Sequence, residues 1–131
     1  MTDIGKPATR VLVVDDSSLV RLYYRSALEK AGFLVEQAIN GIEAMEKVLS
    51  GPFELVILDV NMPRMDGFTF LRSLRSGPAD VATVPTLMIS TESDLQDVSE
   101  AKAAGANLYL VKPVAEAELV GHVRVLTGAT P

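Results

Sequence analysis

The chain has 131 residues, of which 48% are hydrophobic and 22% are charged, and this balance predicts one globular domain with a single core. Its formal net charge of -5 argues against a nucleic-acid-binding groove, which needs basic residues to displace counterions from phosphates. The absence of cysteine excludes a disulfide framework and a nucleophilic thiol, and without a signal peptide or an apolar membrane span we expect a cytoplasmic protein that is not inserted in a membrane.

Apolar runs and helical periodicities alternate along the chain. Residues 10–14 form a valine-rich run typical of a strand buried on both faces. A helix is predicted over 18–31, with Ser17 or Ser18 as the N-cap and Gly32 as the stop, because apolar residues recur at helical spacing. Those residues are Leu19, Leu22, Tyr23, Ala27 and Leu28.

The same alternation predicts the remaining elements, which are strands at 33–37, 55–58, 86–89 and 108–111 and helices at 41–50, 67–76, 94–104 and 115–126. We expect a domain over 10–127, with an N-terminal extension at 1–9 and a C-terminal tail at 128–131. Strands that alternate with helices predict an α/β fold, a three-layer sandwich around a doubly wound parallel sheet with right-handed crossovers. The strand order 2-1-3-4-5 suits this length and places the ligand site beyond the carboxyl ends of strands one and three.

Three carboxylates follow those two strands. Asp15 and Asp16 come directly after the first strand, and Asp59 ends the apolar run of the third. Like charges this close are unfavourable unless a proton or a cation compensates them, and Mg²⁺ is the cation that suits a shallow edge with one or two carboxylates and a phosphate. As the alternative, Asp15 and Asp16 cap the following helix, where acidic groups are favourable in any case.

Two further polar residues end the neighbouring strands. Ser90 follows the fourth strand and Lys112 follows the fifth, so both can face Asp59. A hydroxyl can donate to a phosphoryl oxygen and an ammonium can neutralise its charge. Taken singly, a serine here is more often a cap and a lysine a solvated charge, and it is their joint placement that indicates a phosphate site.

The segments V-V-D-D-S, L-D-V-N-M-P-R-M-D-G, I-S-T-E and L-V-K-P resemble the receiver domains of two-component response regulators over nearly the whole chain. The likeness is greatest to the CheY-like chemotaxis form, which has no output domain. The resemblance implies that Asp59 is the phosphoacceptor, that Asp16, Asp59 and the carbonyl of Asn61 bind Mg²⁺, and that Asp15 orients the waters of the metal.

The resemblance also implies which residues switch conformation on phosphorylation and which set the lifetime of the phosphoryl group. Ser90 and Lys112 would sense the phosphoryl group, and Tyr109 would move inward with Ser90, which would remodel the surface formed by the helix at 94–104, the strand at 108–111 and the helix at 115–126. Asn61 and Glu92 would tune dephosphorylation, and we expect a short-lived phosphoryl group. The lysine–proline bond between Lys112 and Pro113 would be cis.

The implied partners are a histidine kinase as phosphodonor and a downstream protein such as a flagellar motor component, with the chain itself monomeric. We expect no enzymatic activity beyond self-catalysed phosphotransfer and autodephosphorylation. One alternative is a phosphorelay shuttle that passes its phosphoryl group to a histidine phosphotransfer protein. A remote alternative is a phosphatase with an aspartate nucleophile, but such enzymes carry a D-x-D-G-T motif after the first strand, where this chain has D-D-S.

Overall fold

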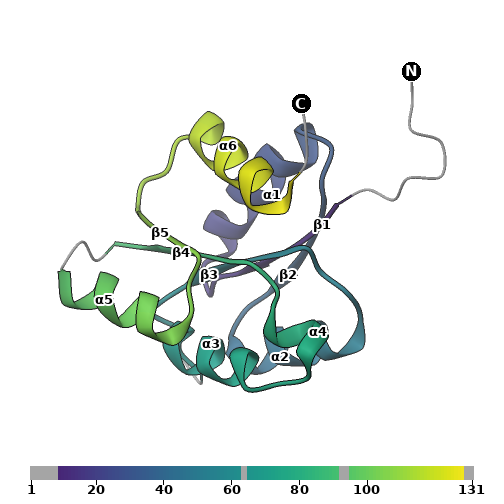
Figure 1. Ribbon diagram of the computed structural model, residues 1–131. Helices are drawn as coiled ribbons and strands as arrows, with labels where there is room; N and C mark the ends of the chain where they lie inside the picture. Colours follow the sequence, from purple (N-terminus) through teal and green to yellow (C-terminus); the bar gives the residue numbers. More distant parts are fainter. Residues whose placement is uncertain (1–8, 63–64, 92–94, 129–131) are drawn as a thin grey trace.

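The computed structural model describes residues 9–62, 65–91 and 95–128, and Figure 1 shows a central sheet with helices on both faces. The strands are β1 (Arg10–Val14), β2 (Leu34–Ala38), β3 (Leu55–Asp59), β4 (Thr86–Ser90) and β5 (Leu108–Val111). The helices are α1 (Ser18–Lys30), α2 (Gly41–Ser50), α3 (Gly67–Arg75), α4 (Ala79–Ala82), α5 (Leu95–Ala104) and α6 (Glu116–Thr127). The predicted helix at 94–104 is therefore α5, and the one at 115–126 is α6.

The predicted ends of these elements are displaced by at most one residue, and the clearest difference is α4, which was not predicted. This single turn follows Pro78, and its four residues are too few to produce a periodic pattern. The strand predicted at 33–37 begins one residue later, because Phe33 still belongs to the turn that ends α1 and its amide donates to Leu28.

All neighbouring strands pair in parallel, and their order is β2-β1-β3-β4-β5, as predicted. The register decides which residues meet at the carboxyl edge of the sheet. Val14 pairs with Leu58, so the residues that directly follow this pair, Asp15 and Asp59, lie side by side. Ser90 pairs with Val111, which brings Lys112 next to the end of β4.

Two hydrophobic layers hold the sheet in place. Alternate residues of the central strands, among them Val13 and Ile57, face α1 and α6 on one side. The residues between them, such as Leu12 and Leu58, face α2, α3 and α5 on the other, as Figure 1 shows. Because β1, β3 and β4 are covered on both faces, their residues are apolar apart from polar ones at the strand ends, which are Arg10, Asp59, Thr86 and Ser90.

Helix α1 turns a different face to the core from the one its periodicity indicates. Tyr24, Ala27 and Leu28 are buried, whereas Leu19, Leu22 and Tyr23 are 78%, 60% and 42% exposed. The helix carries apolar residues on two sides, and only its contact with the sheet selects which side is covered. Its N-cap is Ser17, whose hydroxyl accepts from the amide of Val20.

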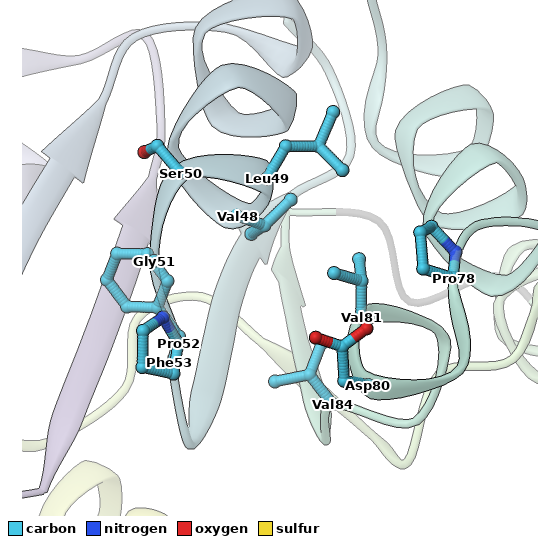
Figure 2. Close-up of a pocket in the computed structure, with 10 residues that line it drawn as sticks. All are labelled: Val48, Leu49, Ser50, Gly51, Pro52, Phe53, Pro78, Asp80, Val81 and Val84. Carbon is cyan, nitrogen blue, oxygen red and sulfur yellow. The ribbon is translucent and has the colours of Figure 1, made fainter.

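The opposite edge of the sheet carries its own polar anchor. The Arg75 guanidinium donates to the carbonyls of Ala82, Val84 and Gly105. It also reaches the side chains of Thr86 and Asn107, so one residue ties α3 to the segments that enter β4 and β5. A cavity of about 600 Å³ lies at this edge, between the end of α2 and α4 (Figure 2). It is the edge at which the strands begin, whereas Asp59 ends β3.

Among the helices that lie within the described residues, none combines the length and apolar character that a bilayer crossing requires.

Candidate functional site

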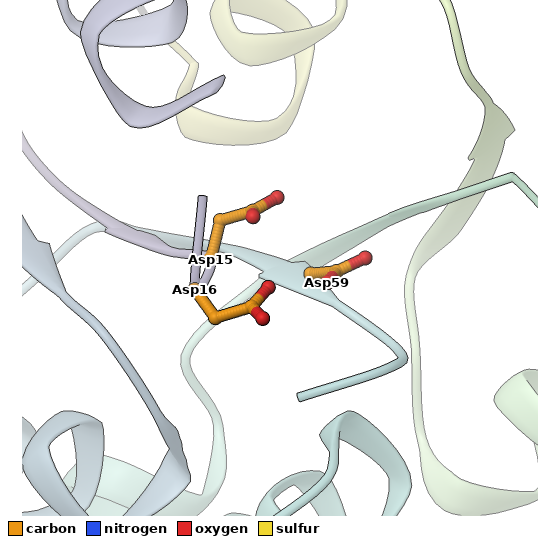
Figure 3. A group of neighbouring side chains, drawn as sticks. All are labelled: Asp15, Asp16 and Asp59. Atoms are coloured by element: carbon orange, nitrogen blue, oxygen red, sulfur yellow. The ribbon is translucent and has the colours of Figure 1, made fainter. Parts of the chain in front are cut away.

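The three predicted carboxylates come together at the carboxyl edge of the sheet. Asp15, Asp16 and Asp59 each offer an oxygen atom, and these atoms lie within 4.8 Å of one another; Figure 3 shows the side chains beyond the ends of β1 and β3. Asp15 and Asp59 are buried, whereas Asp16 is exposed. The cluster therefore has a fixed base and one side open to water.

The alternative role of the pair as caps is only partly met. Asp15 Oδ1 accepts from the amide of Ser17, and this bond leaves Oδ2 facing Lys112. The cap itself is Ser17. Arg21 donates to the backbone carbonyl of Asp15 at 2.7 Å and so fixes the turn between β1 and α1.

Lys112 supplies the positive charge of the site. Its ammonium nitrogen lies 3.1 Å from Asp15 Oδ2 and 3.4 Å from Asp59 Oδ1, so it bridges two of the three carboxylates. The Lys112–Pro113 peptide bond is cis. Burial lowers the pKa of Lys112, but the charges of Asp59 and Asp15 outweigh it and leave that pKa above its ordinary value, so the amine stays protonated at neutral pH.

Asp59 is the most perturbed carboxylate of the cluster. Burial, followed by the charge of Asp15, raises its pKa from 3.8 to about 6, although Lys112 acts in the opposite direction. Negative charge is thus in excess at the site even with the lysine in place. An acidic cluster of hard oxygen donors with one solvent-facing side fits a divalent cation such as Mg²⁺, which keeps several of its waters.

Ser90 and Tyr109 belong to the neighbouring strands β4 and β5. Ser90 is fully buried at the end of β4, on the strand next to Asp59. Tyr109 is half-buried and packs against the hydrophobic layer under α3 and α5, whereas Leu108 and Leu110 pack against the layer under α1 and α6. Met88 pairs with Tyr109 and lies two residues before Ser90 on β4, so the alternation of side chains along a strand places the predicted switch pair on one sheet face.

Of the two residues predicted to tune dephosphorylation, Asn61 is exposed two positions beyond Asp59. Glu92 lies outside the residues that the structure describes. Their roles stay predictions.

Two residues at the site were not singled out from the sequence. A Cβ atom on Gly67 would lie 2.3 Å from the carbonyl oxygen of Asp59 and 3.0 Å from Cα of Val60, so only glycine allows α3 to start this close to the site. Tyr24 is buried, and burial together with Asp15 and Asp59 raises the pKa of its hydroxyl. The Asp66-Gly67 dipeptide at the start of α3 could have indicated the first, whereas the second needs the helix face to be known.

A protein-family model, the response regulator receiver domain, matches residues 11–124 of this chain. The transcriptional regulatory protein PrrA of Mycobacterium tuberculosis is 39% identical over 124 residues, which are 95% of this chain and 52% of that protein. PrrA of Mycobacterium leprae is 40% identical over the same lengths. The chain thus spans about half the length of these relatives.

Solved structures show the same likeness in three dimensions. The chemotaxis protein CheY4 of Vibrio cholerae superposes with a TM-score of 0.87 and 37% identity, covering 92% of this chain and 99% of that one. The signal receiver domain of a signal transduction histidine kinase from Syntrophus aciditrophicus superposes with a TM-score of 0.86 and 32% identity, covering 94% and 92%. Each pairing extends over nearly the whole chain.

Proposed function

The chain belongs to the response regulator receiver domain family, and on that premise we propose that Asp59 accepts a phosphoryl group from the phosphohistidine of a partner histidine kinase. The observation that carries the proposal is the arrangement around Asp59, whose carboxylate lies within 4.8 Å of Asp15 and Asp16 and 3.4 Å from the Lys112 ammonium. The cluster can bind a cation and the ammonium can neutralise phosphoryl oxygens, which are the groups that phosphoryl transfer requires.

In this mechanism an Asp59 oxygen attacks phosphorus while the phosphorus–nitrogen bond of the donor breaks, and the imidazole leaves with the bonding pair and takes up a proton. Asp59 must be ionised to attack, and a pKa of about 6 leaves it ionised at neutral pH. Lys112, already held between Asp15 and Asp59, offers its charge to the transferred oxygens without moving far. When bound, Mg²⁺ would be held by Asp16, Asp59 and the Asn61 carbonyl, with Asp15 orienting its waters, and would neutralise charge on the phosphoryl group.

The phosphorylated state is read by the sheet face that carries Ser90 and Tyr109. The Ser90 hydroxyl turns to the phosphoryl group and Tyr109 follows it inward, which changes the surface of α5, β5 and α6 where a target binds. Their location on one sheet face, with Tyr109 packed against the layer under α3 and α5 and Ser90 two residues beyond its pairing partner Met88, supports this coupling. Water then hydrolyses the acyl phosphate, and Asn61 and Glu92 set the rate, so the chain acts as a switch and not as an enzyme on external substrates.

Two kinds of target have support. A chemotaxis target, such as a flagellar motor component, is favoured by the likeness to CheY4 of Vibrio cholerae over 99% of that chain. Control of transcription is favoured by 39% identity to PrrA over 95% of this chain. Capture of partners by the phosphorylated form separates these targets, and transfer of the label to a histidine phosphotransfer protein would instead indicate a phosphorelay.

The test of the central proposal is phosphate uptake from acetyl phosphate with excess MgCl₂, followed by the intact mass of the protein. The unchanged chain should gain one phosphoryl group and Asp59→Asn should gain none. Asp80→Asn serves as the control, because Asp80 is exposed near the opposite edge of the sheet. Uptake by Asp59→Asn equal to that of the control would refute Asp59 as the acceptor.

A further inference from the structure

An apolar crevice lies between α1 and the segment that joins β5 to α6, and Lys112 is one of its lining residues. It measures about 280 Å³, and its walls include Leu19, Tyr23 and Tyr24 on one side and Lys112, Pro113 and Val114 on the other. Leu19 is 78% exposed and Tyr23 is 42% exposed. Both belong to the side of α1 that the core leaves uncovered.

The two walls of the crevice are tied together. The Tyr23 hydroxyl donates to the carbonyl of Val114 at 2.9 Å, across 91 positions of sequence. The rings of Tyr23 and Tyr24 contact each other with centroids 5.7 Å apart. The crevice therefore exists before any ligand arrives, and a ligand need not order its walls.

Lys112 connects the crevice to the site of reaction. Lys112 lines the crevice, and its ammonium nitrogen lies 3.4 Å from Asp59 Oδ1. In an in-line transfer the leaving group departs on the side of phosphorus opposite Asp59, which is the open side of the sheet edge. A leaving oxygen that interacts with the ammonium carries its substituent along the stem of the lysine into the crevice.

Resting on the phosphoryl transfer to Asp59 proposed above, we propose that this crevice receives the apolar acyl group of a small phosphodonor, so that the chain accepts phosphate from aromatic acyl phosphates in preference to acetyl phosphate. An Asp59 oxygen forms a bond to phosphorus, the bond between phosphorus and the acyl oxygen breaks, and the acid leaves as its carboxylate. Charge and atoms balance without a further reactant.

The size of the crevice fits this class of donor. An apolar cavity of about 150 Å³ holds a benzene ring, and the crevice exceeds that volume. A methyl group reaches little of the apolar wall, whereas a phenyl ring contacts Leu19, Tyr23 and Pro113. Covering these side chains removes apolar surface from water, which is the source of the preference.

The probes are benzoyl phosphate and acetyl phosphate with excess MgCl₂, and the measured quantity is the ratio of their second-order rate constants for phosphorylation. The same ratio with hydroxylamine as the nucleophile corrects for intrinsic reactivity. We expect the corrected ratio to be about tenfold in favour of benzoyl phosphate. A corrected ratio of one would overturn the inference and leave the proposed function intact, whereas failure of both donors would refute both.

Two leucines of α1 give a matched pair of variants. Leu19→Gln should lower the corrected ratio by about threefold or more, since the wall becomes polar, while the rate with acetyl phosphate stays the same. Leu22 lies three positions further along the same helix, is 60% exposed and does not line the crevice. Leu22→Gln should leave the ratio unchanged, and equal ratios in the two variants would contradict the inference.

Benzoate added to the labelled protein gives a readout independent of turnover. The backbone amide chemical shifts of the protein should change at Leu19, Tyr23 and Val114. Shifts confined to the cavity between α2 and α4, at Val81 and Val84 (Figure 2), would place the apolar ring elsewhere and overturn the assignment.

Discussion

Replacing the acceptor carboxylate should stabilise the metal-free protein. Burial and the charge of Asp15 raise the pKa of Asp59 from 3.8 to about 6 in the folded state. A carboxyl group whose pKa is raised by folding binds its proton more tightly in the folded chain, so ionisation at neutral pH favours unfolding. The substitution Asp59→Asn would keep the shape of the neutral acid and remove that cost.

The magnitude follows from the pKa difference. Each tenfold difference in proton affinity is worth about 1.4 kcal/mol, so the pKa difference corresponds to an upper limit of about 3 kcal/mol at neutral pH. Water on the open side of the site screens part of the repulsion, and we expect Asp59→Asn to raise the free energy of unfolding by about 1–2 kcal/mol at about pH 7.5.

The pH dependence of the free energy of unfolding tests the direction of this effect. The stabilising contribution of the protonated form is complete below the unfolded pKa and is lost as the pH rises through the folded value of about 6. The advantage of Asp59→Asn over the unchanged chain should therefore grow between about pH 4 and pH 7, and at pH 4 it should be less than about a quarter of its value at pH 7.5.

Urea unfolding in EDTA, followed by far-UV circular dichroism because the chain has no tryptophan, measures these free energies. Asp80→Asn controls for the loss of one negative charge at an exposed position. The reasoning is refuted if Asp59→Asn is no more stable than the unchanged chain at neutral pH, or if its advantage is the same at both ends of the pH range.

Three further predictions concern the metal, the start of α3 and the opposite edge of the sheet. Addition of about 10 mM MgCl₂ should raise the thermal midpoint of the unchanged chain, and Asp16→Asn should lose most of that rise; an equal rise in calorimetry would contradict a role for Asp16. Gly67→Ala should lower the free energy of unfolding by about 2 kcal/mol or more and abolish phosphate uptake, because the new Cβ meets the backbone of Asp59 and Val60. As the control, Gly121→Ala has nothing within 4 Å of its Cβ and should stabilise α6 by about 0.5–1 kcal/mol, so equal urea midpoints of the two variants would contradict this prediction. Arg75→Met should lower the free energy of unfolding by about 2–4 kcal/mol, because it removes the hydrogen bonds that the guanidinium donates to the carbonyls of Ala82, Val84 and Gly105. A loss below about 0.5 kcal/mol in urea unfolding would contradict this stabilising role of Arg75.

The α/β order of the chain could be predicted because the central strands β1, β3 and β4 are buried on both faces and their interiors are therefore apolar. The carboxylates, Ser90 and Lys112 could be assigned to one edge because parallel strands place their carboxyl ends together. These conclusions need only the type and order of residues. The short α4 escaped prediction because a single turn has no period.

Other features depended on how the elements pack. Helix α1 carries apolar residues on two sides, and only its contact with the sheet decides that Tyr24 is buried beside the site while Leu19 and Tyr23 line an open crevice. The contacts of Arg75 join residues far apart in sequence, so no local pattern indicates them. The residue types at the ends of the strands thus determined the chemistry of the edge. The register and the packing of α1 decided the raised pKa of Asp59 and the open crevice beside α1, because burial and electrostatic repulsion depend on distances that exist only in the folded chain.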